Sequence, residues 1–181
     1  MPLFYLELRA EQLENVAKLL TDGVKRWEFC VRCTHCNEVS HLRRSCVGSD
    51  VSSLQEAAKN VYCEPGVLLP IPGSRGEAHV VLRCKQCERV SSAELVEAAR
   101  KGVKLGELSE PEKWTRVAAL DFRGLEPVAL DVGRSGPFAV ETSGGQRVEV
   151  PAFEDGDWCD YNDREDTSVG VYKLQAQFVR G

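Results

Sequence analysis

Two Cys-x-x-Cys pairs are the residues of this chain whose types and spacing could do chemistry. They are Cys33 with Cys36 and Cys84 with Cys87, and each pair lies in the pattern apolar-Arg-Cys-x-x-Cys after a strand-like run. A turn of this spacing lets two thiolates converge on one ion, and two such turns complete a tetrahedron of sulfur around Zn²⁺. The sequence therefore predicts one zinc ion per chain, bound by these four cysteines.

A third cysteine makes the first pair ambiguous, because the stretch CVRCTHC also allows Cys30 to pair with Cys33. Superposing VRCTHC on LRCKQC places Cys30 opposite Val81, at an apolar strand position. Residues three apart in an extended strand point to opposite faces. We therefore expect Cys30 to be a small buried hydrophobic residue and not a ligand.

The same pairs have a second interpretation as dithiol–disulfide couples. Redox Cys-x-x-Cys motifs usually begin a helix whose N-terminus lowers the thiol pKa, and neither pair here opens a helical pattern. Zinc is the favoured interpretation, and a thiol-redox or metal-handling protein is the alternative. Four thiolates leave the ion no open position, which is typical of a structural site. We expect backbone N–H groups of the two turns, more than Arg32 or Arg83, to stabilise the thiolates.

The three histidines offer no catalytic constellation. His41 and His79 are isolated, and His35 lies inside the first pair but opposite Gln86 of the second, so we expect it at the surface. No HExxH, P-loop, GxGxxG or nucleophile-elbow pattern occurs. The sequence predicts a binding protein and not an enzyme.

Residues 154–166 carry seven acidic side chains and one arginine. A calcium site is one interpretation, but EF-hand spacing is absent. We expect a solvated connecting loop, which Trp158 and Tyr161 pack onto the sheets.

Composition limits the class of partner. The 181 residues are 43% apolar and 28% charged, with a net charge of −5. This acidic balance weighs against nucleic acid or an anionic membrane as a partner, because both attract basic proteins. No apolar run is long enough for a membrane span, and the N-terminus lacks the basic region of a signal peptide. We expect a monomer in the cytoplasm, with the nucleus as the second location, whose partner besides zinc is another protein.

Short runs rich in β-branched and aromatic residues predict an all-β fold. The alternation of Tyr172, Leu174, Ala176 and Phe178 predicts one continuous strand, and Ser143–Gly145 predicts a hairpin turn. Residues 52–61 and 91–102 are the best helical patterns, although the second equally fits a strand. Residues 63–76, rich in Pro and Gly, predict a loop.

A weak internal repeat relates LRAEQLENV (8–16) to FRGLEPV (122–128). It predicts a single domain made by duplication, with a zinc-bearing half at about 1–105 and a half without cysteine pairs at 106–181.

These stretches, together with RCTHCNEVS, GSRGEAHVVLRCKQC and DWCDYNDREDTSVGVYKLQAQFV, resemble the eukaryotic family of CXXC motif-containing zinc-binding proteins. The resemblance implies two related sandwich-like β halves, zinc at Cys33, Cys36, Cys84 and Cys87, and no established catalysis. The segment between the two cysteine pairs is longer than the family pattern, and this surplus of residues falls near 49–66. Cys46, Cys63 and Cys159 also look particular to this chain, and we interpret all three as non-ligands.

Overall fold

The computed structural model describes residues 2–39, 61–97 and 102–181. Within these ranges the chain forms strands and no helix, and the strands pair antiparallel in several sheets. This confirms the predicted all-β fold. The described part of the chain accordingly contains no helix that is long and apolar enough to cross a membrane.

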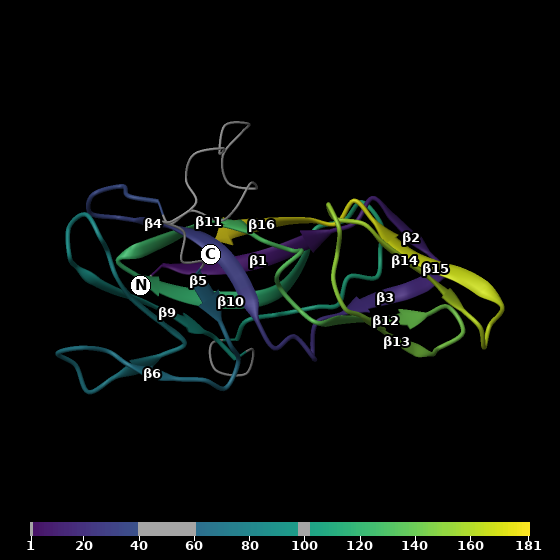
Figure 1. Cartoon of the computed structure of the whole chain (residues 1–181), viewed down its shortest axis with the longest axis horizontal. Helices are drawn as coiled ribbons and strands as arrows, with labels where there is room; N and C mark the ends of the chain where they lie inside the picture. The colour runs from purple at the N-terminus through teal and green to yellow at the C-terminus, as the bar shows by residue number, and fades with distance from the viewer. Residues whose placement is uncertain (1, 40–60, 98–101) are drawn as a thin grey trace.

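One end of the elongated molecule, here called the cysteine lobe, consists of two facing sheets (Figure 1). The larger has the order β16 (Gln175–Arg180), β1 (Leu3–Arg9), β10 (Thr115–Arg123), β9 (Val90–Leu95), β8 (Val80–Arg83). The smaller has the order β11 (Leu125–Leu130), β4 (Trp27–Cys33), β5 (Val61–Cys63). A short hairpin of β6 (Leu69–Pro70) and β7 (Glu77–Ala78) adjoins them.

The other end, here called the distal lobe, contains two three-stranded sheets. Their orders are β13 (Arg147–Val150), β12 (Phe138–Thr142), β3 (Val16–Leu20), and β14 (Trp158–Asn162), β15 (Thr167–Tyr172), β2 (Gln12–Glu14). The predicted turn at Ser143–Gly145 joins β12 to β13, with Gly145 at φ 85°. That prediction is confirmed.

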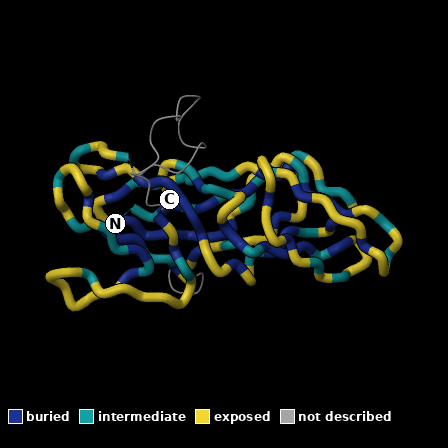
Figure 2. The backbone as a smooth tube through the Cα atoms, viewed as in Figure 1, coloured by how far each residue is buried: buried dark blue, intermediate teal, exposed yellow. Residues whose placement is uncertain are grey.

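Alternating burial along the strands creates the core. In β1, Phe4, Leu6 and Leu8 are buried and the residues between them are half-buried, as expected for a strand with one face on the core. Phe122 of β10 then makes an edge-to-face contact with Phe29 of β4, 5.9 Å between ring centroids, and this contact joins the two sheets. The main buried cluster continues through both lobes, and Figure 2 shows buried backbone along the length of the molecule.

Each lobe contains strands from both parts of the sequence. The first strands of the two predicted halves, β1 and β10, pair with each other; β16 pairs with β1 and β9 with β10. The last strand of each predicted half, β9 or β16, therefore pairs with the first strand of the other half, β10 or β1, in one sheet. The duplication itself stays a prediction.

Two sequence predictions about the C-terminal region are wrong. Residues 154–166 are more than a connecting loop, since β14 lies within them and pairs with β15; Trp158 is buried as predicted, but Tyr161 is 53% exposed. The expected single strand around Tyr172–Phe178 is two strands, because Lys173 has a left-handed backbone, φ 52°, that separates β15 from β16.

The helical patterns have different outcomes. The second, at 91–102, begins as strand β9, the alternative that the sequence allowed. The first helical pattern, at 52–61, lies outside the described residues except for its last residue, Val61. His41, Cys46 and most of the surplus at 49–66 also lie outside them. The predicted loop at 63–76 starts with the last residue of β5 and includes β6.

Candidate metal centre

The structure brings together the four sulfur atoms of the two predicted pairs. The Sγ atoms of Cys33, Cys36, Cys84 and Cys87 all lie within 4.8 Å of one another. The sulfur of Cys33 lies 3.7 Å from that of Cys87, and the sulfur of Cys36 lies 3.4 Å from that of Cys84. A tetrahedron with Zn–S bonds of about 2.3 Å has edges of about 3.8 Å. The cluster thus has the donor type and the size that zinc requires.

Two turns with the same backbone geometry hold these sulfurs, and we call them the first and second knuckles (residues 33–38 and 84–89). In the first, the Cys33 N–H donates to the carbonyl of Glu38 at 2.8 Å, and the Asn37 N–H donates to the carbonyl of Cys33 at 2.9 Å. The second repeats both bonds: the Cys84 N–H donates to Arg89 at 3.0 Å, and the Glu88 N–H to Cys84 at 2.9 Å. Local hydrogen bonding therefore determines the shape of each turn.

The knuckles come from opposite sheets of the cysteine lobe. The first follows β4 of the small sheet and is closed by a bridge between Arg32 and Val39. The second joins β8 to β9 of the large sheet and is closed by the pair Arg83 and Val90. The four sulfurs meet because the two sheets pack face to face, so a bound ion would link one sheet to the other.

Backbone N–H groups of the knuckles stabilise charge on the two buried sulfurs. The N–H groups of Cys36 and then His35 hydrogen-bond to the sulfur of Cys33 and lower its pKa to about 7. The N–H of Cys87 lowers the pKa of Cys84 in the same way. Arg32 and Arg83 are exposed, and the guanidinium of Arg83 donates to the carbonyl of Glu88. The prediction that N–H groups act on the thiolates is confirmed.

Without a cation, the clustered thiols hinder one another's ionisation. At Cys36 the N–H of Glu38 lowers the pKa, but desolvation and the neighbouring thiols outweigh it and raise the pKa to about 12. Like charges at these separations repel, so four thiolates need a compensating divalent ion. Without a cation, Cys36 keeps its proton at neutral pH, and the four sulfurs do not all ionise together.

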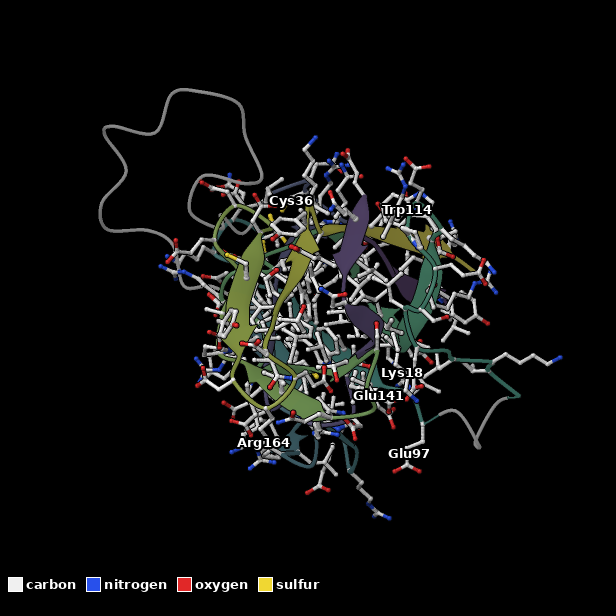
Figure 3. All side chains as sticks on the ribbon, turned by 90° about the vertical axis from the view of Figure 1, so that its right-hand side faces the viewer. Lys18, Cys36, Glu97, Trp114, Glu141 and Arg164 are labelled. Atoms are coloured by element: carbon white, nitrogen blue, oxygen red, sulfur yellow. The ribbon has the colours of Figure 1, made fainter. Side chains whose placement is uncertain are left out.

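The remaining cysteines lie outside the cluster, as predicted for those that the structure describes. Cys30 is fully buried in β4. Cys63 is fully buried in β5, and burial raises its pKa to about 12. Cys159 is exposed on β14. Within the cluster, Cys36 and Cys87 are only half-buried, and Figure 3 labels Cys36.

The histidines agree with the sequence prediction where they are described. His35 is exposed, although it lies inside the first knuckle. The Nδ1 atom of His79 accepts a hydrogen bond from the N–H of Leu95 at 3.1 Å, and burial lowers the pKa of this imidazole. His79 thus has a structural contact in the large sheet and takes no part in the cluster.

A groove beside the cluster had no signal in the sequence. It has a volume of about 560 Å³ and runs between β5 and β8, reaching Cys33 and Cys84. Its apolar walls include three side chains that are more than 40% exposed: Tyr62, Val67 and Leu69. Within the described residues, β5 and β8 each end a sheet, so the groove is bordered by two open strand edges.

Comparison with known proteins gives consistent matches. The model of the family described as "CXXC motif containing zinc binding protein, eukaryotic" matches residues 49–179. A Caenorhabditis elegans protein named UPF0587 protein F46B6.12 is 29% identical over 99% of this chain and 95% of its own length. The Bos taurus CXXC motif containing zinc binding protein is 30% identical over 97% of this chain and 96% of its own. The part of this chain that these two alignments cover includes residues 33–87, whereas the family model starts after the first cysteine pair.

Two solved structures have the same fold. The structure named C1orf123 has a TM-score of 0.73 and 27% identity, and the alignment covers 99% of each chain. A hypothetical protein from Plasmodium falciparum also has a TM-score of 0.73, at 24% identity, over 99% of this chain and all of that one.

Proposed function

The chain belongs to the family of eukaryotic CXXC motif containing zinc binding proteins, and we propose on that basis that its four clustered cysteines bind one structural zinc ion. The observation that carries the proposal is the convergence of four sulfurs from two geometrically matched knuckles. Such an ion, when bound, supplies a positive charge that joins the two sheets of the cysteine lobe. Four sulfur ligands complete its coordination, so we assign it no catalytic role.

Metal analysis of the purified native chain, combined with thiol counting, tests this assignment. We expect one zinc per chain and slow reaction of the four clustered thiols until a chelator is added. Native protein that is folded but takes up neither Zn²⁺ nor Co²⁺ from solution would overturn the proposal.

We further propose that the chain is a protein-interaction module whose contact surface is the groove beside the cluster. Its exposed apolar side chains, and two strands that end their sheets in the described part of the chain, suit an extended peptide. A strand edge offers backbone N–H and C=O groups for pairing, and the walls accept alternate side chains. Charged side chains line both borders: Arg83 and Lys85 lie on the β8 side, and Glu38 and Glu64, the latter ion-paired with Arg26, lie on the side of the small sheet. We place this module, a monomer, in the cytoplasm or the nucleus, where thiols stay reduced.

A random peptide library tests the groove. Peptides selected by the native chain should lose binding in Leu69→Asp and Val67→Asp, while zinc content stays unchanged. Val128→Asp on β11 is the matched control, since Val128 is also exposed but does not line the groove. Equal peptide binding by Leu69→Asp and Val128→Asp would place the interaction elsewhere.

The alternative function, metal handling or thiol redox chemistry, is favoured by one observation: Cys36 and Cys87 are only half-buried, whereas Cys33 and Cys84 are buried. Rapid and reversible oxidation of the clustered thiols at cellular potentials, or fast transfer of zinc to a competing chelator, would support it over the structural role.

A further inference from the structure

The corner between β10 and β11, which lies within the stretch FRGLEPV (122–128), contacts both knuckles. Its residue Gly124 has φ 75°, a left-handed backbone. The carbonyl of Gly124 accepts a hydrogen bond from the N–H of Thr34, inside the first knuckle, at 3.1 Å. It also accepts one from the hydroxyl of Ser91, just after the second knuckle, at 3.3 Å.

The space around Gly124 admits no side chain. A Cβ atom at this position would lie 2.7 Å from the Oγ of Ser91 and 3.3 Å from its Cβ. Ser91 is buried on β9, so its hydroxyl can move aside only by giving up the bond to the Gly124 carbonyl. The residue after Gly124 extends the contact, because Leu125 pairs with Cys33 in the β11–β4 ladder.

We infer that Gly124 is a positioning residue for the metal centre: its carbonyl fixes the distance between the two knuckles and thereby sets the affinity for the ion. The inference rests on the proposed zinc function and goes further, because it assigns part of the affinity to a residue that contributes no ligand. Hydrogen-bonding groups around metal ligands typically change metal affinity about ten- to a hundredfold when they are removed.

Gly124→Ala in the full chain tests the inference, with Gly145→Ala as the matched control. Gly145 also has a left-handed backbone, φ 85°, but lies in the β12–β13 turn with nothing within 4 Å of its Cβ position. Both substitutions strain the backbone, and only the first separates Ser91 from the corner. We expect Gly124→Ala to weaken Zn²⁺ affinity, measured by chelator competition, about tenfold or more, and to alter the tetrahedral absorption bands of bound Co²⁺. Gly145→Ala, which has the backbone strain without the clash, should leave affinity and spectrum unchanged.

Two further variants keep the test decisive if Gly124→Ala folds poorly. Ser91→Ala removes one of the two hydrogen bonds without adding atoms, and we expect an affinity loss of about two- to tenfold. Ser91→Gly combined with Gly124→Ala removes the clash, and affinity should return to the level of Ser91→Ala. Native affinity and a native Co²⁺ spectrum in both Gly124→Ala and Ser91→Ala would overturn the positioning role while leaving the zinc site intact. A native chain that binds no metal would overturn both proposals.

Discussion

Asn37 and Glu88 occupy the same position in the two knuckles, and both have a left-handed backbone, with φ of 60° and 59°. Each donates its N–H to the carbonyl of the first cysteine of its pair. Asparagine adopts this conformation readily, whereas a left-handed backbone costs most other residues about 1–2 kcal/mol. The first knuckle therefore has a residue suited to its geometry, and the second is strained.

Replacing Glu88 should relieve this strain. We expect Glu88→Asn to raise the free energy of unfolding by roughly 0.5–1 kcal/mol and to slow zinc release to a chelator. Glu88→Gln is the control, since it removes the same negative charge near the thiolates but keeps the unfavourable side chain. Equal gains in the two variants, measured by urea unfolding, would attribute the effect to charge and contradict the conformational explanation.

Substitution of the ligands separates the cluster from the other cysteines. Cys33→Ser and Cys84→Ser should lose most of the bound zinc and a few kcal/mol of stability, because metal binding is part of the folding free energy. Cys30→Ala and Cys159→Ser should keep one zinc per chain, measured by elemental analysis. Full zinc content in Cys33→Ser would contradict the ligand assignment.

Removal of the metal should open the knuckles without unfolding the chain. The main apolar cluster extends through both lobes and does not depend on the sulfurs, so β1 and β10 stay packed. We expect hydrogen exchange of the metal-free protein to speed up at the amides of Cys33, Thr34 and Cys84, while amides of β1 and β10 keep their protection. Loss of protection throughout the molecule would show that the ion holds the whole fold together.

Cys63 should make stability fall at alkaline pH. Burial raises the pKa of its thiol from 9.0 to about 12, so the folded state holds this proton more tightly than the unfolded state. The resulting stabilisation is fully present below pH 9 and is lost as the pH rises toward 12. Cys63→Ala should therefore reduce the fall in stability above pH 9, measured by urea unfolding at a series of pH values.

Cys159→Ala is the control for that experiment, because it removes an exposed thiol instead of a buried one. Parallel slopes for the native chain and Cys63→Ala between pH 9 and pH 11 would contradict the prediction.

The sequence alone determined which two cysteine pairs form the cluster, that Cys30 lies outside it, and that the fold is all-β. These features depend on local rules: the spacing in Cys-x-x-Cys specifies a turn, and alternating β-branched residues specify strands with one buried face. The same rules failed at two places. The left-handed backbone of Lys173 divides the expected single strand into β15 and β16. Tyr161, on the end strand β14, is exposed and does not pack onto the sheets as expected.

Only the tertiary structure decided how the pairs meet. The knuckles end strands of different sheets, and their convergence follows from the packing of Phe29 against Phe122 and from the β1–β10 pairing, contacts between residues far apart in the chain. The role of Gly124 and the groove at β5 and β8 also arise from this packing. Spacing within a turn specifies local geometry, whereas the distance between two turns depends on the whole core that holds their strands.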